Sequence, residues 1–403
     1  MGEVSEDHLF GVYNRAPIEV ERGEGTRLYD RSGRSYLDFV QGIATNGLGH
    51  AAPVLVEAVT RQAQKLWHVS NIFTIPDQKA LADRLCAASF ADQVFFTNSG
   101  TEAIECAIKA ARKYHSHKGN DERADIITFQ GAFHGRTLAA VTAGGYEPYI
   151  TGFGPRLPGF VNVSLDDPEA IRAAAEAPTA AAIMIEPVQG EGGARALSDT
   201  ELQTLRDLCD NNGLLLILDE IQCGMGRTGK LWAYEYSDVT PDIMCIAKAL
   251  GGGFPIGACL ATRDAASGMI VGTHGSTFGG NPLAMAVGLT AFGEISKPEL
   301  LDNVNRVSGY LRQQLEGLKD AWPDMIDEVR GKGLLVGIKV KPNNREVMGA
   351  ARDAGLLIAG GSDNCVRMLP PLNLTEAEAR EGVALLEKAF EALRAAAKAK
   401  ETA

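Results

Sequence analysis

Two apolar runs that each end in a charged residue constrain the fold of this chain most. LLLIL at 214–218 is followed by Asp219, and IMCIA at 243–247 is followed by Lys248. Continuous apolar runs of this length are typical of central strands in a parallel sheet that is covered on both faces. Ligands of open α/β sheets bind beyond the carboxyl ends of the strands, so the two charged side chains are predicted to converge on one crevice. The pair fits a ligand that needs both an amine and an anion.

The composition narrows the class of protein. With 403 residues and 45% hydrophobic residues, the chain has material for a large core in two domains. Its net charge of -12 argues against non-specific binding to nucleic acid or to anionic membranes. No apolar run approaches the roughly 20 residues of a membrane span, and the N-terminus lacks the regions of a signal peptide. We therefore expect a cytoplasmic protein with neither nucleic acid nor membrane as a partner.

Cysteines and histidines give no pattern for a metal. The seven cysteines contain no CxxC pair, so we interpret them as small buried hydrophobes in a reducing compartment. His115 and His117 have no Cys or acid partner at ligand spacing, and we interpret them as surface residues on a loop. No metal site is expected.

A Gly-containing segment after VFFT (94–97) is a candidate phosphate site. Ser99, Gly100 and Thr101 open a helix that begins AIECAIKAARKY. A helix N-terminus presents free backbone N–H groups and a positive dipole end, and both favour a phosphate. The alternative, a plain N-cap, stays open on this motif alone.

Other polar groups follow further predicted strands. QGAFHGRT places Phe133 and Arg136 after the strand DIITF, where the ring could stack on a flat cofactor and the guanidinium could hold a carboxylate. A packed phenylalanine and a surface arginine are the alternative. Glu191 lies in a Gly-rich loop after AAIMIEP, and Ser276 and Thr277 offer hydroxyls in the loop THGSTFGGNP. The GIATNGLGH segment at 42–50 fits either a turn or a substrate-lining loop.

Together these parts match pyridoxal phosphate. Its aldehyde condenses with an amine such as that of Lys248, its ring nitrogen needs a carboxylate such as Asp219, and its phosphate needs backbone donors. Gln222, which follows Asp219 closely, can hydrogen-bond the phenolic oxygen. The sequence has neither the GxGxxG of dinucleotide folds after a first strand nor a GxxxxGK[ST] motif.

The chain closely resembles the class III, or ω-, aminotransferases, which are pyridoxal phosphate enzymes of fold type I. The resemblance runs from about residue 12 to 395 through NSGTEAIECAIKAARK, FHGRT, IEPVQGEGG, LDEIQCGMGRTGKLWAYE, AKALGGGFPIGA, HGSTFGGNPLA and VRMLPPL. It implies an α/β fold with a mostly parallel sheet flanked by helices. The implied organisation is a large cofactor-binding domain at 51–297 and a smaller α+β domain formed by 298–403 with the N-terminal segment 1–50.

The resemblance also implies roles for single residues. Lys248 and Asp219 would be catalytic, with Lys248 holding the cofactor and moving a proton. The implied cofactor-binding set is Ser99, Gly100, Thr101, Phe133, Asp219, Glu220, Ile221, Gln222, Lys248 and Thr277. Thr277 would come from the other subunit of a homodimer. The implied substrate-binding set is Arg136, Ser276, Glu191, Arg367 and Tyr13, in which Arg367 holds a second carboxylate or pairs with Glu191 when an ω-amine binds.

Within this family the resemblance is to enzymes that act on N2-acetyl-L-ornithine and 2-oxoglutarate in arginine biosynthesis. Succinylornithine, ornithine and 4-aminobutyrate are alternative amine donors. An aminomutase or racemase would keep the same lysine and aspartate but would need no 2-oxo acid. A catalytically inert binding protein is the remaining alternative, and the intact motif set argues against it.

Overall fold

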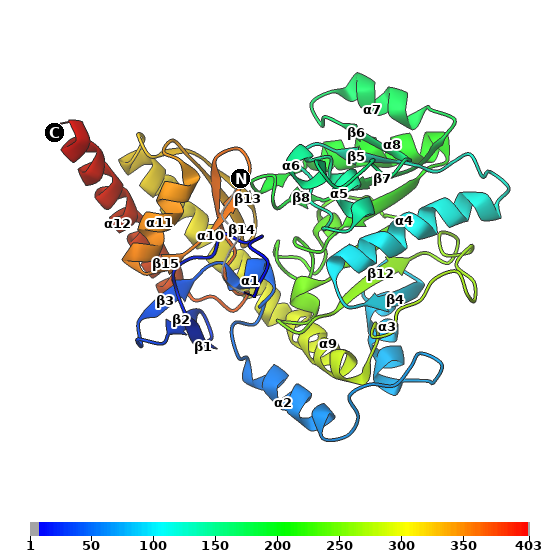
Figure 1. Ribbon diagram of the computed structural model, residues 1–403, viewed down its shortest axis with the longest axis horizontal. Helices are drawn as coiled ribbons and strands as arrows, with labels where there is room; N and C mark the ends of the chain where they lie inside the picture. The colour runs from blue at the N-terminus through cyan, green and yellow to red at the C-terminus, as the bar shows by residue number, and fades with distance from the viewer. Residues whose placement is uncertain (1–7, 402–403) are drawn as a thin grey trace.

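The computed structural model describes residues 8–401, which form a larger and a smaller unit side by side (Figure 1). The larger unit is built on a seven-stranded sheet in the order β4-β12-β11-β10-β7-β5-β6. The strands are β4 (Gln93–Thr97), β5 (Asp125–Phe129), β6 (Phe160–Val163), β7 (Ala180–Ile185), β10 (Leu215–Asp219), β11 (Ile243–Ile246) and β12 (Gly257–Ala261). Only β12 runs antiparallel, to both β11 and β4, so the carboxyl ends of the other six strands lie at one edge. The prediction of a mostly parallel sheet is confirmed.

Helices cover both faces of this sheet. One face is covered by α4 (Gly100–His117) and α5 (Leu138–Gly144), and the other by α3 (Pro76–Ala87), α7 (Pro168–Ala175), α8 (Asp199–Asn212) and α9 (Pro282–Ile295). Every residue of β7, β10 and β11 is therefore buried, which explains their continuous apolar sequences. The remaining elements of the unit are α2 (Pro53–Ala63), α6 (Glu147–Ile150), β8 (Val188–Gln189), β9 (Arg195–Ala196), and the 3₁₀ turns η1 (Ala233–Tyr236) and η2 (Lys248–Leu250).

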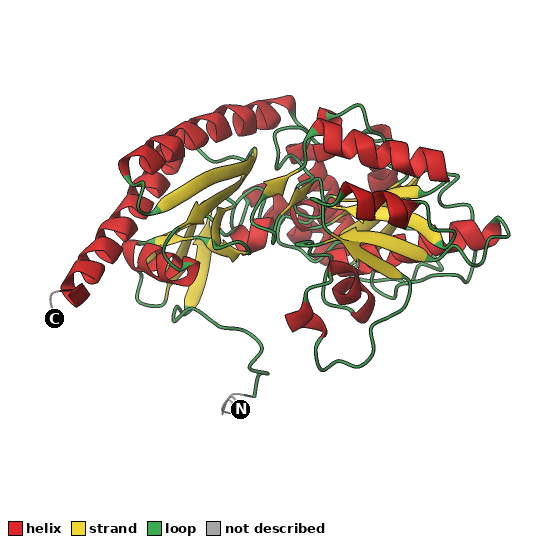
Figure 2. Cartoon of the chain, turned by 90° about the horizontal axis from the view of Figure 1, so that it is seen from above, coloured by secondary structure: helices red, strands yellow, loops and turns green. Residues whose placement is uncertain are grey.

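The smaller unit combines the two ends of the chain. One sheet has the order β1-β2-β3-β15 and the other β13-β14-β17-β16. Its elements are β1 (Val20–Glu24), β2 (Arg27–Asp30), β3 (Ser35–Asp38), α1 (Gln41–Ala44), α10 (Pro298–Ala321), β13 (Ile326–Lys332), β14 (Leu335–Val340), α11 (Asn344–Ala354), β15 (Leu356–Leu357), β16 (Ala359–Gly361), β17 (Cys365–Met368) and α12 (Glu376–Glu401). Figure 2 shows α12 running to the C terminus at the edge of the molecule.

Contacts between distant segments hold the N-terminal strands in this unit. β3 pairs in parallel with β15, and the Thr26 hydroxyl donates to Glu378 at 2.5 Å. Arg27 forms an ion pair with Glu381 at 2.6 Å. The division into 1–50, 51–297 and 298–403 stays a prediction, and these pairings support it.

Two local predictions were wrong. Lys248 does not end its strand, because β11 stops at Ile246 and the lysine begins η2 with a φ of 45°. His115 and His117 do not lie on a loop, because α4 extends through His117. His115 is buried, and its Nε2 lies 2.9 Å from the carbonyl oxygen of Ala181 in β7.

Membrane insertion of a helix has no support in the part of the chain that is described. No helix within residues 8–401 combines the length and the hydropathy that a bilayer crossing requires. The seven cysteines are all free, and six of them are buried.

Candidate active site

A cavity of about 440 Å³ lies at the carboxyl edge of the large sheet. Its position follows from the parallel strands, which deliver the residues after β4, β7, β10 and β11 to the same edge. Nine of the predicted site residues line it: Ser99, Gly100, Thr101, Phe133, Arg136, Asp219, Ile221, Gln222 and Lys248. The structure therefore brings the lysine and the aspartate of the two apolar runs to one cavity.

Lys248 is held in a strained backbone conformation. Its φ of 45° is in the left-handed region, which costs a residue with a Cβ about 1 kcal/mol or more. Burial lowers the pKa of the lysine, and the charge of Arg367 acts in the same direction, whereas Glu191 and Asp219 oppose the shift. No side chain within residues 8–401 is hydrogen-bonded to its ammonium group. A lowered pKa increases the share of neutral amine, which is the nucleophilic form.

Asp219 has a buried partner that sequence analysis did not assign. Its Oδ2 lies 2.8 Å from Nδ1 of His134, and its Oδ1 accepts from the backbone N–H of Ile221 at 3.0 Å. Burial alone would lower the pKa of His134, but the hydrogen bond and charge of Asp219 leave it raised. The other ring nitrogen, Nε2, is buried without a partner in the described chain. His134 therefore orients the carboxylate of Asp219.

Glu186, which directly follows β7, is a second residue to which the sequence analysis assigned no role. Its carboxylate accepts from the backbone N–H of Phe133 at 3.0 Å and of Gly190 at 3.3 Å. Burial raises the pKa of Glu186, and the nearby charge of Asp219 raises it further. Buried groups with perturbed pKa values cluster at functional sites, and Glu186 fixes the backbone that carries Phe133.

The start of α4 is an N-cap, and it also leaves backbone N–H groups free for a phosphate. The Ser99 hydroxyl is an N-cap that accepts from the backbone N–H of Glu102 at 3.3 Å. The N–H groups of Gly100 and Thr101, in the first helical turn, have no acceptor within the helix and lie at the cavity. A Cβ on Gly100 would lie 2.8 Å from Ile221, so the helix start fits against that side chain only as glycine. An anion can be held here by backbone donors.

Arg136 is exposed at the rim of the cavity. Its guanidinium lies 3.6 Å from the ring centroid of Tyr149 and 5.6 Å from that of Phe133. No acid within the described residues pairs with it, so its charge is available to a carboxylate. This placement favours ligand binding over a plain surface arginine.

Arg367 lies on β17 and is fully buried. Its Nη2 donates to Glu191 at 2.6 Å, and its Nη1 donates to Gln222 Oε1 at 3.2 Å. The carbonyl oxygen of Gly360 accepts from its Nε at 2.9 Å. Since Oε1 of Gln222 serves Arg367, its Nε2 remains to donate into the cavity. The Arg367–Glu191 ion pair joins the smaller unit, which contains β17, to the loop after β8 in the larger unit.

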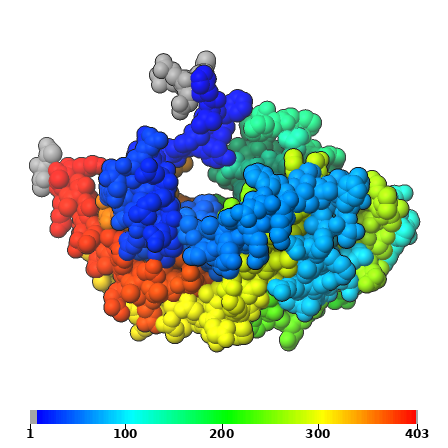
Figure 3. Space-filling view, turned by 90° about the horizontal axis from the view of Figure 1, so that it is seen from below, coloured from blue at the N-terminus to red at the C-terminus, as the bar shows by residue number. Residues whose placement is uncertain are grey.

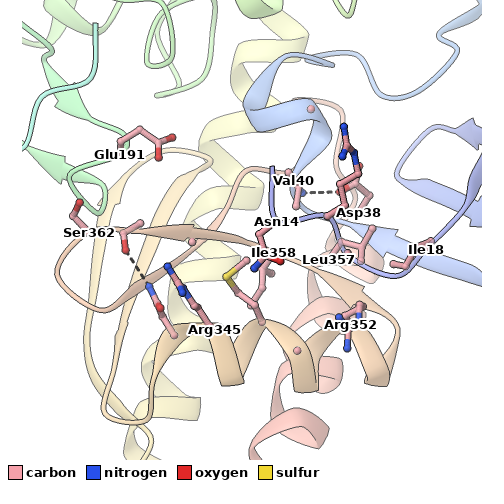
Figure 4. A pocket seen from close by; sticks show the side chains of 18 of the residues that line it. Asn14, Ile18, Asp38, Val40, Glu191, Arg345, Arg352, Leu357, Ile358 and Ser362 are labelled. Atoms are coloured by element: carbon pink, nitrogen blue, oxygen red, sulfur yellow. Dashed lines mark hydrogen bonds between the residues drawn. The ribbon is translucent and has the colours of Figure 1, made fainter. Parts of the chain in front are cut away.

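A second cavity of about 1160 Å³ adjoins the first through Phe133. Figure 3 shows the surface hollowed between the N-terminal segment, in dark blue, and the green part of the larger unit. Figure 4 shows Glu191 on one side of this cavity, with Arg345 and Arg352 of α11 below it. The GIATNGLGH loop contributes Gly42, Asn46 and His50 to its lining, so the interpretation as a loop beside a ligand cavity is favoured.

Six predicted residues do not line the first cavity: Glu191 and Arg367, which pair beside it, and Glu220, Ser276, Thr277 and Tyr13. Glu220 is buried, and its carboxylate accepts from the backbone N–H groups of Ala233 at 2.6 Å and Tyr234 at 2.8 Å, so its contacts are structural. Ser276 lies near the rim, where its Oγ accepts from Asn98 Nδ2 at 3.4 Å. Thr277 is exposed on the same loop. Tyr13 is 73% exposed and lines neither cavity.

Residues 11–390 match the model of the family described as Aminotransferase class-III. Acetylornithine aminotransferase 2 of Caulobacter vibrioides is 65% identical over 396 residues, which is 98% of each chain. Acetylornithine aminotransferase of Agrobacterium fabrum is 56% identical, covering 96% of this chain and 97% of the relative.

Solved structures show the same likeness. The ornithine aminotransferase of Toxoplasma gondii superimposes with a TM-score of 0.92 at 32% identity, covering 96% of this chain and 93% of that one. The N-acetylornithine aminotransferase of Stenotrophomonas maltophilia gives a TM-score of 0.84 at 39% identity, covering 95% of this chain and 98% of that one. Both similarities extend over the larger and the smaller unit.

Proposed function

The chain belongs to the class-III aminotransferases, and we propose that it transfers the δ-amino group of N2-acetyl-L-ornithine to 2-oxoglutarate. The products are N-acetyl-L-glutamate 5-semialdehyde and L-glutamate, and the reaction serves arginine biosynthesis. The observation that carries the proposal is the Arg367–Glu191 pair beside Lys248, because it lets one site take both a dicarboxylate and an amine-bearing chain. The names of the relatives at 65% and 56% identity support the donor.

Pyridoxal 5'-phosphate is the cofactor of this family, and the residues of the smaller cavity fit it. The amine of Lys248 suits its aldehyde, Asp219 its ring nitrogen, and the N–H groups of Gly100 and Thr101 its phosphate. Phe133 offers an aromatic face. When bound, the cofactor supplies an electron sink that stabilises a carbanion on the substrate carbon bearing the nitrogen.

The chain's own residues supply charge and proton transfer. The amine of Lys248, whose lowered pKa favours the neutral form, would take a proton from the substrate carbon that bears the amino group and pass it to the cofactor, and it would move a proton in the opposite direction in the second half-reaction. Asp219 is held in place by its hydrogen bond with His134, whose pKa is raised, and its carboxylate would pair with the ring nitrogen of the cofactor. The buried wall of β10 and β11 excludes water from these groups.

Substrate selection uses three charges. Arg136 holds the carboxylate of acetylornithine, and Glu191 then occupies Arg367 so that this guanidinium is not left unpaired. When glutamate or 2-oxoglutarate binds, its second carboxylate replaces Glu191 on Arg367. A site with two arginines and one mobile acid can therefore serve both half-reactions.

The same proposal includes a homodimer. Large apolar side chains are exposed on two loops: Trp67, Ile72, Phe73, Ile270, Val271 and Phe278. These loops lie together, because Asn71 Nδ2 donates to the carbonyl oxygen of Gly279 at 2.9 Å. Exposed apolar patches of this kind mark protein interfaces, and the loop also carries Ser276 and Thr277. A second copy covering the patch would bring Thr277 to the partner's cavity.

We also place the enzyme in the cytoplasm. Its cysteines are free, with the sulfur atoms used as buried apolar groups. Free buried thiols are usual in reducing compartments, whereas secreted proteins tend to pair them. Fractionation of the native host, with an antibody against the chain, tests this placement.

A steady-state comparison of amine donors tests the function. N2-acetylornithine, succinylornithine, ornithine and 4-aminobutyrate are each measured with 2-oxoglutarate, and kcat/KM is expected to be highest for acetylornithine. The likeness to the Toxoplasma gondii ornithine aminotransferase makes ornithine the second candidate. A higher kcat/KM for ornithine or 4-aminobutyrate would exclude the proposed donor. Turnover without 2-oxoglutarate would indicate an aminomutase or racemase, and an absent absorbance band near roughly 420 nm would indicate an inert protein.

A further inference from the structure

The loop that carries Glu191 is anchored to the smaller unit by its backbone. Residues 190–194 connect β8 to β9, both in the larger unit. The carbonyl oxygen of Glu191 accepts from the backbone N–H of Ser362 at 2.8 Å. That of Gly193 accepts from Arg330 Nε at 2.6 Å, and the thiol of Cys365 lies 3.6 Å from it. The loop is thus held by residues of the sheet that also carries Arg367.

The fit between this loop and the sheet leaves no spare room. Gly193 has a φ of 90°, and a Cβ there would lie 2.3 Å from Arg330 Nη2 and 2.9 Å from the carbonyl oxygen of Ser362. A Cβ on Gly337 of β14 would lie 2.7 Å from the carbonyl oxygen of Gly193. Two glycines therefore allow the backbones to approach, and the loop cannot shift toward the sheet.

Arg330 is itself fixed at the centre of this contact. Its Nη1 donates to Asp363 at 2.8 Å and lies 3.5 Å from Glu328, and its side chain is 18% exposed. Asp363 also pairs with Lys339 at 3.1 Å. A guanidinium held on one side by an acid and on the other by the Gly193 carbonyl is a rigid link between the sheet and the loop.

The side chain of Glu191 can move, although its backbone is held in place. It is 34% exposed, and Arg367 Nη2 is its hydrogen-bond partner at 2.6 Å. Glu191 can therefore leave Arg367 by rotating its side chain while the loop stays in place. The fraction of time that Glu191 is paired with Arg367 depends on how firmly the loop backbone holds Glu191 near that guanidinium.

We propose that Arg330 is a positioning residue that sets the occupancy of Arg367 by Glu191 and so sets the preference between ω-amine donors and dicarboxylates. The inference rests on the proposed function, in which Glu191 and the second carboxylate compete for Arg367. Without Arg330 the loop is held by fewer contacts and Glu191 pairs less often. Arg367 is then more available, which favours glutamate and 2-oxoglutarate over the acetylated amine donor.

The test compares Arg330→Met with Arg312→Met, both in the holoenzyme. Arg312 and Arg330 line one further cavity of the protein. The Nη2 of Arg312 donates to the Gly331 carbonyl at 3.0 Å, but Arg312 has no hydrogen bond to the Glu191 loop within the described chain. Single-turnover kinetics give the ratio of kcat/KM for L-glutamate to that for N2-acetylornithine. Calorimetry gives the Kd of glutarate, an unreactive dicarboxylate. For Arg330→Met the ratio is expected to rise roughly 2–30-fold and glutarate to bind tighter by a similar factor, with neither changed in Arg312→Met.

Glu191→Gln serves as the reference that separates the two hypotheses. If Glu191→Gln raises the ratio and Arg330→Met does not, the role of Arg330 is overturned and the competition for Arg367 stands. If Glu191→Gln leaves the ratio unchanged, the competition itself is wrong. The double variant is expected to match Glu191→Gln, and a further rise in it would overturn the proposal. Should Arg330→Met fail to fold, Arg330→Lys is judged by the same ratio and the same glutarate Kd.

Discussion

The cofactor side and the substrate side of this site are built in different ways. Asp219 is the last residue of β10 and Lys248 comes shortly after β11, and both strands are buried throughout in one sheet. Glu191 and Arg367 are 176 residues apart and come from different units. The first arrangement fixes the chemistry in a rigid frame, whereas the second depends on contacts between two units. Chemistry and selectivity should therefore be separable by mutation.

Lys248→Ala should have the largest effect and should not discriminate between the two sides. Loss of the amine removes both the covalent link and the proton carrier, so both half-reactions are expected to fall on the order of 10⁴-fold. Single-turnover rates with acetylornithine and with glutamate measure this, together with the absorbance band of the holoenzyme. Substantial turnover with either substrate would break the assignment of Lys248.

Asp219→Ala should reduce both half-reactions equally but less severely. The variant keeps the lysine and is expected to retain some pyridoxal phosphate while losing roughly 10²–10³-fold in turnover, because the charge that supports the electron sink is gone. Near-normal activity would refute the role of Asp219. Cofactor content, measured after denaturation, separates lost chemistry from lost binding.

Arg367→Gln should affect the two half-reactions unequally. This variant therefore tests directly whether the substrate side can be changed separately from the cofactor side. Loss of a charged hydrogen bond of about 1.5–3 kcal/mol should raise KM for 2-oxoglutarate roughly 10–150-fold. The half-reaction with acetylornithine should change less, since the variant removes a charge that Glu191 otherwise neutralises. Equal losses in both half-reactions would contradict the division into two sides.

Glu220→Gln should have the smallest effect on turnover, since Glu220 follows Asp219 but faces neither cavity. Gln can accept only one of the two backbone N–H bonds, so a stability loss of about 1–3 kcal/mol is expected with kcat little changed. Urea unfolding measures this loss.

The same variant tests a pH effect. Burial raises the pKa of Glu220 from 4.5 to about 8, so the folded protein binds a proton that the unfolded chain has lost between these pH values. The free energy of unfolding of the wild type should therefore fall as the pH rises through this window. Glu220→Gln should remove that part of the slope. An unchanged slope in urea unfolding at a series of pH values would contradict the raised pKa.

Much of the fold could be predicted because local signals agree with burial. α8 starts at a Ser198–Glu201 capping box and ends at Gly213, and both signals are present in the local sequence. The strand DIITF matches β5, and Thr375 and Glu378 form a capping box at the start of α12. The apolar runs also place Asp219 and Lys248 at one edge of the sheet, because the direction of a parallel strand decides at which edge it ends.

The rest of the site depends on contacts between distant segments. Nothing local to FHGRT indicates that His134 reaches Asp219, 85 residues away. The resemblance places Glu220 with its neighbours in the cofactor-binding set. A turn after a strand points successive side chains in different directions, and the carboxylate of Glu220 accepts from backbone N–H groups away from the cavity. The left-handed φ of Lys248 has no local signal, because lysine has no preference for it and tertiary contacts impose it. The roles of the site residues stay predictions.

The pairing of the chain's two ends sets an order of events during synthesis on the ribosome. Thr26 meets Glu378 across 352 residues, so the first strands leave the exit tunnel long before their partners exist. At about 5–20 residues per second, the delay is roughly 20–70 s. Leu37 and Phe39, fully buried in the finished protein, are without their final cover for that time. The larger unit can fold during the delay, and the smaller one is completed only near the end of translation, so chaperone dependence should concentrate in the N-terminal strands.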